Sequence, residues 1–349
     1  CKKAIELNSN YAEAYNNLGV TYKELGNLDD AIIFCKKAIE LNSNYAEAYN
    51  NLGIALKDYK KLEESEINYK RAIKLNPMYA EAYNNLGILF KDKNELENSK
   101  INYQKAIELK SDYAEAYYNL GITFRELGEL EKSETSYKLA IKYNPSYAEA
   151  YNNLGVTLRE LCKLDDSEKA YKKAIELKNN YPDPYNNLSF TLLLKNQFEE
   201  AYKFSEWRWQ TKYNIGKKFI TNKPLWNGEN NKTILVWKEQ GIGDEIMYNS
   251  ILPELNAISK KLIVHCDKRL IPLFRRSFSN DVIFESNKEN ISNNDFDYHI
   301  PIGSMPLFFR KNLKSFLNSS KGYLKSDNNK TIKFINQLKN NENVKLVGL

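Results

Sequence analysis

A tyrosine recurs every 34 residues through the first part of the chain and divides it into units of equal length. The recurring residues are Tyr11, Tyr45, Tyr79, Tyr113, Tyr147 and Tyr181. With the residue after Tyr11 as position 1, position 7 is always leucine, and positions 8 and 27 are glycine and alanine in five of six units. Small residues at fixed positions let two helices approach closely, while larger side chains fill the remaining space. The spacing therefore predicts a stack of helix pairs.

Turn-forming residues separate the two helices of each predicted pair. Near position 15 stand Gly26, Asn94, Gly128 and Asn196, which tolerate a left-handed backbone. Two prolines near the unit ends, Pro77 and Pro145, stop the second helix. The pattern resembles the tetratricopeptide repeat from residue 12 to about residue 215. This resemblance implies an α-solenoid over residues 1–209, with a partial unit at 1–11, units beginning at 12, 46, 80, 114 and 148, and a degenerate unit at 182–215.

Position 6 is asparagine in every unit, and the six residues are Asn17, Asn51, Asn85, Asn119, Asn153 and Asn187. Stacked repeats form a superhelix whose first helices line a concave groove. An asparagine amide both donates and accepts hydrogen bonds, so it can bind a peptide backbone of any sequence. The YNNLG unit resembles the repeats of O-linked N-acetylglucosamine transferases, and this resemblance implies an asparagine ladder that holds protein substrates. The alternative is that asparagine at position 6 is common in tetratricopeptide repeats generally, and that the Asn-rich composition of this chain raises its frequency further.

Position 2 is acidic in every unit, and its residues are Glu13, Glu47, Glu81, Glu115, Glu149 and Asp183. A groove that clamps a carboxylate would require lysine at this position. We therefore expect that any peptide in the groove is not strongly acidic.

The remaining composition excludes several classes of protein. A net charge of +6 over 349 residues, with Lys and Glu interspersed, is typical of an ordinary surface and does not favour nucleic-acid binding. The four cysteines are far apart and include no CxxC pair, so neither zinc nor disulfides are indicated, and a reducing, cytoplasmic location is expected. No apolar run reaches the roughly 18 residues of a membrane span. The chain starts inside a repeat, so we expect it to be a fragment.

The sixth unit departs from the pattern. Position 27 becomes Arg208, between Trp207 and Trp209. A large cation cannot enter a site built for alanine, so we expect this segment to pack against something other than another repeat. Residues 210–231 contain the turn-rich sequence KPLWNG and are expected to form a connector.

Beyond residue 231 the 34-residue period is absent, and strand-like and helix-like segments alternate. Strands are predicted at 233–237, 262–266, 282–285 and 296–300, and helices at 244–259 and 269–277. This alternation indicates a parallel, Rossmann-like sheet with helices on both faces. We expect this lobe to cover 232–342 and the first strand of a truncated second lobe to begin at 343–349.

The turn after the first strand is the main candidate for a functional site. Residues 238–240 are polar, Gly241, Ile242 and Gly243 follow, and Asp244 opens the predicted helix. A glycine turn at a helix N-terminus presents unpaired N–H groups that attract anions. Dinucleotide binding of the GxGxxG type is excluded because Ile246 stands where glycine is needed. A Walker loop is excluded because no GK[ST] sequence follows.

Several separated blocks resemble bacterial proteins that join these repeats to a glycosyltransferase domain of the heptosyltransferase type. The blocks are PLWNGE at 224–229, WKEQGIGDEIMYNSILPEL at 237–255, DYHIPIGSMP at 297–306, GYL at 322–324 and VKLVGL at 344–349. This resemblance implies a two-lobed, metal-independent enzyme with no resident cofactor, in which a nucleotide-sugar binds mainly to the second lobe.

The same resemblance implies roles for individual residues. Asp244 would be the general base that takes the proton from the acceptor hydroxyl. Its alternative role is a helix N-cap, and the two roles can coexist. Glu239 and His299 are weaker catalytic candidates, while His265 is expected to be structural. The loop that meets the phosphate or the acceptor would contain Gln240, Gly241, Ile242, Gly243 and Ser304.

These observations favour a glycosyltransferase whose repeats bind a protein or peptide acceptor. The alternative is a non-catalytic scaffold in which the repeats mediate protein–protein interaction. Because the donor lobe would be almost entirely missing, we expect no turnover by this chain alone.

Overall fold

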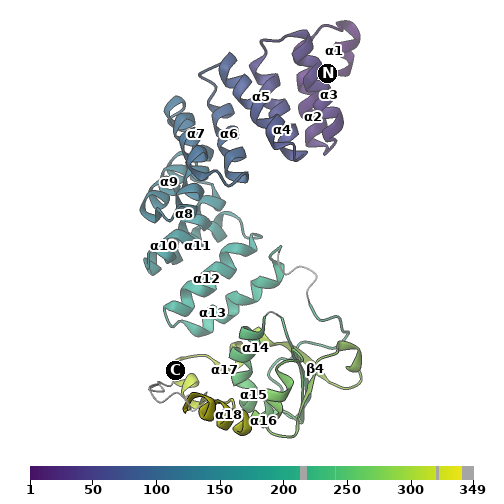
Figure 1. Ribbon diagram of the computed structural model, residues 1–349, viewed down its shortest axis with the longest axis vertical. Coiled ribbons are helices and arrows are strands. Elements are labelled where there is room, and N and C mark those ends of the chain that lie inside the picture. Colours follow the sequence, from purple (N-terminus) through teal and green to yellow (C-terminus); the bar gives the residue numbers. More distant parts are fainter. Residues whose placement is uncertain (213–217, 240, 320–321, 340–349) are drawn as a thin grey trace. The chain divides into compact units, whose positions relative to one another are not determined.

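The computed structural model describes residues 1–212, 218–239, 241–319 and 322–339. The chain divides into two compact units, Cys1–Pro184 and Tyr185–Leu349 (Figure 1). The expected start of a second lobe at 343–349 lies outside the described residues. Within them, no helix is both long enough and apolar enough to cross a membrane.

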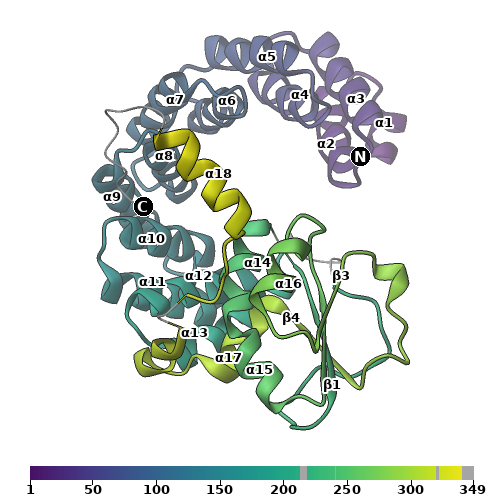
Figure 2. The ribbon, with the colours of Figure 1, turned by 60° about the horizontal axis from the view of Figure 1, so that its bottom comes forward.

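The first unit consists of a short helix, α1 (Lys2–Leu7), and five helix pairs. The pairs are α2 (Ala12–Glu24) with α3 (Leu28–Leu41), α4 (Ala46–Asp58) with α5 (Leu62–Leu75), α6 (Ala80–Asp92) with α7 (Leu96–Leu109), α8 (Ala114–Glu126) with α9 (Leu130–Tyr143), and α10 (Ala148–Glu160) with α11 (Leu164–Leu177). Figure 2 shows that the first helix of each pair lies on the inner side of a curved array, and the second on the outer side. The predicted solenoid is confirmed.

The turns inside the pairs have the left-handed backbone that the sequence indicated. The φ angles are +77° at Gly26, +61° at Asn94 and +77° at Gly128. Lys60 and Cys162 adopt the same conformation, with φ of +66° and +58°, although neither residue favours it. The turn geometry is therefore set by the helix pair and not by glycine alone.

The glycine at position 8 lies directly against an aromatic ring of the second helix. A Cβ added at Gly53, Gly87, Gly121 or Gly155 would lie 2.7 Å from the nearest ring carbon. The four rings belong to Tyr69, Tyr103, Tyr137 and Tyr171, which are fully buried and whose hydroxyls have no hydrogen-bond partner among the residues that the structure describes. In the first pair Cys35 takes the place of the tyrosine, with its Sγ 2.6 Å from a Cβ added at Gly19. The predicted close approach at this position is confirmed.

The second unit begins within α12 (Pro182–Leu194), which is followed by α13 (Phe198–Ser205) and the 3-10 turn η1 (Glu206–Gln210). Four strands then form a parallel sheet in the order β3-β2-β1-β4, and their bounds are β1 (Thr233–Trp237), β2 (Lys261–His265), β3 (Val282–Glu285) and β4 (Tyr298–Pro301). The other helices are α14 (Ile242–Tyr248), η2 (Asn249–Ile251), α15 (Leu252–Ile258), α16 (Ile271–Ser277), η3 (Lys288–Asn290), η4 (Ile302–Ser304), α17 (Pro306–Phe309), η5 (Leu313–Ser319) and α18 (Asn328–Lys339). The predicted strands are confirmed to within two residues at each end.

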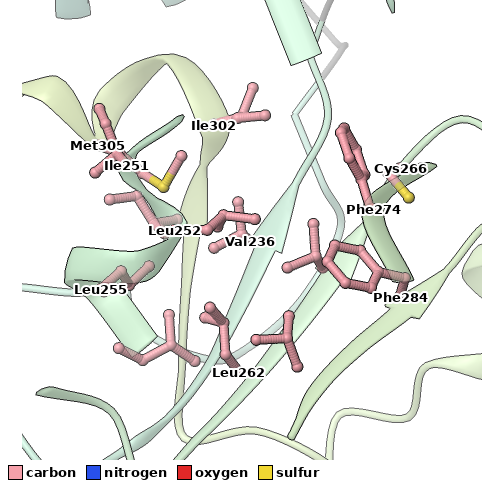
Figure 3. Close-up of a cluster of buried hydrophobic side chains, with 14 of the residues drawn as sticks. Val236, Ile251, Leu252, Leu255, Leu262, Cys266, Phe274, Phe284, Ile302 and Met305 are labelled. Atoms are coloured by element: carbon pink, nitrogen blue, oxygen red, sulfur yellow. The ribbon is translucent and has the colours of Figure 1, made fainter. Parts of the chain in front are cut away.

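One face of the sheet carries the main core of this unit. Val236 and Leu262 lie beside Leu252 and Leu255 of α15, while Phe284 lies beside Phe274 of α16, with 5.5 Å between the ring centres (Figure 3). Residues of α14, α16 and α17 pack against the same cluster. Burial of these apolar side chains provides most of the stabilisation of the sheet.

The opposite face is covered differently from the prediction. Its residues Leu235, Trp237 and Ile263 pack against Trp209 of η1, Phe219 of the connector and Ile291. Among the described residues, the α-helices that pack on the sheet lie on the first face alone, so the expectation of helices on both faces is wrong for this part of the chain. The crossover from β3 to β4 contains only the turn η3, because it is too short and polar for a packed helix.

The helix predicted at 244–259 is wrong in its start and in its continuity. The helical segment starts at Ile242, with Gly241 as N-cap, and it is interrupted by η2 before α15 begins. Pro253 lacks the N–H that would bond to the carbonyl of Asn249, which explains the interruption.

Strand order reverses at β1, because β2 and β3 lie on one side of it and β4 on the other. In a parallel sheet, such a reversal leaves a crevice at the carboxyl ends of the two diverging strands. The residues that follow β1 and β4, including Glu239 and Gly303, lie at this crevice.

Replacing Gly87 by alanine should destabilise the first unit despite the higher helix propensity of alanine. The new methyl group would clash with the ring of Tyr103, and overpacking of this kind costs about 1–3 kcal/mol of the free energy of unfolding. Thermal and urea unfolding followed by circular dichroism measure the loss. The same substitution in a Tyr103→Leu background should cost much less, because the ring is gone. Equal costs in both backgrounds would show that the ring contact is not the cause.

Candidate functional site

A buried arginine lies at the carboxyl ends of β1 and β4. Arg208 of η1 is 7% exposed and donates two parallel hydrogen bonds to Glu239, from Nε to Oε2 at 2.9 Å and from Nη2 to Oε1 at 3.0 Å. Its Nη1 donates to Oε1 of Glu206 at 2.7 Å, and its Nη2 donates to Oγ of Ser304 at 2.8 Å. A planar guanidinium matches a carboxylate in this two-point geometry. We call Arg208, Glu206, Glu239 and Ser304 the arginine network.

The arginine network joins three segments that are far apart in the sequence. Glu239 follows β1, and its Oε1 also accepts a hydrogen bond from the backbone N–H of Gly303 at 2.7 Å. Ser304 follows β4 and donates to Oε1 of Glu206 at 2.7 Å. The side chain of Arg208 is too large for position 27 of a repeat, which is otherwise alanine. The structure shows that it packs instead against Glu239 and Ser304. The sequence singled out Arg208 but gave no sign of its partners.

A cavity of about 320 Å³ opens beside the arginine network within the second unit. α12, α13, η1, α14 and η4 all contribute residues to its wall. Arg208, Glu239 and Asp244 supply charged groups, while Phe190 and Met247 supply exposed apolar ones. The crevice expected from the sheet topology is therefore a cavity of the size of a small ligand.

Asp244 lies on the wall of this cavity and is half-buried. It forms no hydrogen bond or ion pair with any residue that the structure describes. The N-cap of α14 is Gly241, and no side chain caps this helix. The interpretation of Asp244 as an N-cap is therefore wrong, because the helix starts two residues earlier. Its carboxylate remains available to a ligand.

The glycines of the turn are not required by the packing of the described chain. A Cβ added at Gly241 or Gly243 would have no described atom within 4 Å, and neither residue has a positive φ. Ile242 packs against the core of the sheet. Gln240 lies outside the described residues.

The charges around the cavity favour a ligand that donates hydrogen bonds. The guanidinium of Arg208 is already engaged by two carboxylates, and Asp244 adds a further negative charge. Burial raises the pKa of the Tyr248 hydroxyl, which lines the same cavity and therefore stays a neutral donor. A phosphate group would be repelled by the carboxylates of this wall. Among the described lining residues, the only cation is Arg208, which is already paired with carboxylates. Hydroxyl groups of a sugar would suit this surface better than a diphosphate.

The two histidines are separate from the cavity. His299 is 8% exposed, and its Nδ1 accepts a hydrogen bond from Nε1 of Trp237 at 3.0 Å. Burial lowers the pKa of His299. Burial, together with Lys238 and Lys288, lowers the pKa of His265 to about 4. Both imidazoles are therefore neutral at pH 7, and neither is among the described residues that line the cavity.

In the first unit, the asparagines at position 6 link successive repeats. Four of them donate from Nδ2 to the position-5 side chain of the preceding repeat, and the pairs are Asn51 to Asn16 at 3.0 Å, Asn85 to Asn50 at 3.0 Å, Asn119 to Asn84 at 3.2 Å and Asn153 to the hydroxyl of Tyr118 at 3.2 Å. The position-5 asparagines are buried. Sequence reasoning missed this role, although the paired NN of the repeat was its signal.

The carbonyl oxygens of these asparagine amides differ in whether they accept a hydrogen bond. The Oδ1 atoms of Asn51, Asn85 and Asn119 accept no hydrogen bond from the residues that the structure describes. Asn153 differs because its Oδ1 accepts from Asn152 at 3.2 Å. Asn17 is exposed in α2, and Asn187 lies in α12 of the second unit. The amides of Asn51, Asn85 and Asn119 are therefore fixed through Nδ2, and their carbonyl oxygens have no described donor, although Asn119 is only 8% exposed.

Replacing Arg208 by methionine should destabilise the second unit by about 3–5 kcal/mol, because Glu239 would keep a buried charge without its partner. Urea unfolding followed by tryptophan fluorescence measures this unit selectively, since all four tryptophans lie in it: Trp207, Trp209, Trp226 and Trp237. Adding Glu239→Gln should recover part of the loss.

The exposed pair Lys203–Glu199 provides the matched control. Lys203→Met should cost less than about 1 kcal/mol. A similarly small cost for Arg208→Met would contradict a structural role for the arginine network.

Comparison with known families supports the repeat assignment. Models described as Tetratricopeptide repeat match residues 12–45, 148–181 and 34–67, and a model described as TPR repeat matches 58–94, 89–124 and 121–161. A search of curated proteins found no match.

Two solved structures with TM-scores above 0.5 share the helical fold at low sequence identity. PilF of Pseudomonas aeruginosa is 15% identical, with a TM-score of 0.53 over 57% of this chain and 90% of that chain. The Cut9–Hcn1 hetero-tetramer of APC/C contains a chain that is 14% identical, with a TM-score of 0.55 over 62% of this chain and 43% of that chain. YrrB, described as a TPR protein with an unusual peptide-binding site, is 23% identical, with a TM-score of 0.42 over 52% and 94% of the two chains. Residues 12–181 are therefore an array of tetratricopeptide repeats.

Proposed function

We propose that the repeat array binds an extended polypeptide along the inner side of its first helices. The observation that carries this proposal is the row of unused Oδ1 acceptors at Asn51, Asn85 and Asn119. Helices α4, α6 and α8, which carry them, lie on the inner side of the array (Figure 2). A polypeptide backbone offers N–H donors to such a row whatever its sequence.

The inter-repeat hydrogen bonds make these acceptors effective. Because Nδ2 of Asn85 is bonded to Asn50 at 3.0 Å, the orientation of the amide is fixed before any peptide arrives. A group that is already ordered loses little conformational entropy on binding. The same bonds that join the repeats therefore prepare the groove for a peptide.

Replacing Asn51, Asn85 and Asn119 together by alanine should weaken peptide binding about tenfold or more, since each lost hydrogen bond is worth about 0.5–1.5 kcal/mol. Fluorescence anisotropy with a set of labelled, unstructured peptides measures the affinity. The matched control replaces Asn68, Asn98 and Asn102, which lie on the second helices. Unchanged affinity in the groove variant, or an equal loss in the control, would contradict the proposal.

A second candidate function is glycosyl transfer at the cavity of the second unit. It is favoured by the unpaired carboxylate of Asp244 at the carboxyl ends of two parallel strands, where α/β proteins bind ligands. The sequence blocks that resemble heptosyltransferases include this turn. Asp244 would take the proton from an acceptor hydroxyl as the sugar is transferred. The carboxylate-rich wall suits an acceptor better than the diphosphate of the donor.

Asp244→Asn should reduce transfer by about 100-fold or more, because loss of a general base removes a contribution of this size. Release of nucleotide from a set of nucleotide-sugars, in the presence of an acceptor peptide, measures the reaction in the protein that contains this chain. The melting temperature should not change, since the Asp244 carboxylate forms no hydrogen bond or ion pair with a described residue. Full transfer by the variant would remove Asp244 from the mechanism.

A further inference from the structure

Two of the five complete repeats carry a lysine at position 31, and each lysine contacts the equivalent carboxylate and tyrosine of its own repeat. Nζ of Lys110 lies 3.6 Å from Oε1 of Glu81 and 4.8 Å from the ring centre of Tyr113. Nζ of Lys178 lies 3.0 Å from Oε1 of Glu149 and 5.2 Å from the ring centre of Tyr181. The carboxylate is position 2 and the tyrosine is position 34 of the same repeat. We call this pair of groups the lysine socket.

The other three repeats have the socket but no lysine. Position 31 is Asn42, Asn76 or Asn144, and each asparagine Oδ1 accepts a hydrogen bond from the backbone N–H two residues later, at 3.1, 3.1 and 3.2 Å respectively. These side chains are therefore held in the turn. The corresponding carboxylates, Glu13, Glu47 and Glu115, are exposed and form no ion pair with a residue that the structure describes. Two of them accept a hydrogen bond instead, Glu47 from the hydroxyl of Tyr45 at 3.4 Å and Glu115 from Nδ2 of Asn84 at 3.3 Å.

The socket of the fourth repeat opens onto a cavity of about 560 Å³. Glu115, Asn144 and Tyr147 line this cavity, so it lies where the lysine of the third and fifth repeats would lie. Tyr118, which replaces the asparagine of position 5, also lines it, and its ring centre is 4.8 Å from that of Tyr147. Two aromatic rings and a carboxylate thus surround a space that no side chain of the repeat fills.

The electrostatics of this cavity favour a cation. Glu115 and Asp112 line it, while the charge of Lys110 on the same wall is opposed by Glu81. Burial raises the pKa of the Tyr147 hydroxyl, so its ring stays neutral and electron-rich. An ammonium group is attracted both by such a ring and by a carboxylate. An acidic side chain would be repelled by the same groups.

We propose that the socket of the fourth repeat binds the side chain of a lysine in the extended polypeptide that occupies the groove. This inference rests on the proposed peptide binding and names the chemistry of the partner. Asn119, whose Oδ1 is unused, lines the same cavity. A peptide can therefore give a backbone N–H to Asn119 and a lysine side chain to Glu115 and Tyr147. Lys110 and Lys178 show within the chain how such a side chain is held.

The test compares two fluorescein-labelled probes by anisotropy at low salt. One is an unstructured Ser/Gly peptide with evenly spaced lysines, and the other is the same peptide with every lysine acetylated. The unmodified probe should bind about three- to tenfold more tightly, as expected for one partly exposed cation contact. Asn144→Lys should remove most of this preference, because the new lysine would fill the socket as Lys110 does. Glu115→Gln should also reduce it.

Two controls separate the socket from other effects. Asn144→Met removes the turn hydrogen bond, as Asn144→Lys does, but adds no charge, and the preference should remain. Glu63→Gln changes the net charge by the same amount as Glu115→Gln on the exposed surface of α5, and the preference should again remain. Lys110→Asn should strengthen binding of the unmodified probe about threefold, because it empties a second socket.

The outcomes distinguish the inference from the function on which it rests. Equal binding of the two probes by the unaltered protein would overturn the lysine socket and leave peptide binding intact. Loss of preference in Asn144→Met or in Glu63→Gln would also overturn it, since the turn or the net charge would then be responsible. Failure of both probes to bind would overturn the proposed function and this inference together.

Discussion

The contact between a glycine of the first helix and a buried ring of the second helix is the constraint on which the repeat array depends. A methyl group does not fit between Gly87 and Tyr103, so the distance between the two helices is fixed at that point. The same contact recurs in four consecutive repeats, and it makes these four pairs nearly identical. Identical pairs stack in a regular way, so side chains on the inner side recur at regular intervals. The regular arrangement of side chains on the inner side is thus a consequence of the glycine–tyrosine packing within each helix pair.

The sequence predicts this part of the fold well because the contacts that define it are close in the chain. Position 8 and the ring it touches belong to one repeat, and the turn between them is short. The role of the asparagines was harder to predict. Asn51 donates to Asn16 of the preceding repeat, and which of the two neighbouring asparagines points across depends on how repeats stack. Periodicity gives the positions of these amides but not their partners.

In the second unit, strands were easier to predict than the site. Each strand is a short apolar run, and local pattern is sufficient for it. The arginine network joins Arg208 to Glu239 and Ser304, which are 31 and 96 residues away. Only the position of β4 beside β1 brings them together, and no local pattern records it. The absence of a helix in the crossover to β4 likewise follows from the length of that segment, whereas the break before Pro253 has a local cause, the missing N–H of the proline. The cavity wall is also formed by residues from several elements, so its charge depends on the topology. The glycine motif taken alone therefore predicted an anion site, although carboxylates line the cavity.

Position 31 shows how a repeat protein can vary its binding without changing its fold. Lysine and asparagine both occur there, and neither touches the glycine–tyrosine contact that fixes the helix pair. With asparagine, the side chain stabilises the turn, and the carboxylate of position 2 forms no ion pair with a described residue. With lysine, the same carboxylate is neutralised from within the chain. Each repeat is therefore either open or closed to an external cation at little cost in stability. The order of lysine and asparagine along the array would then specify where a partner must place its positive charges.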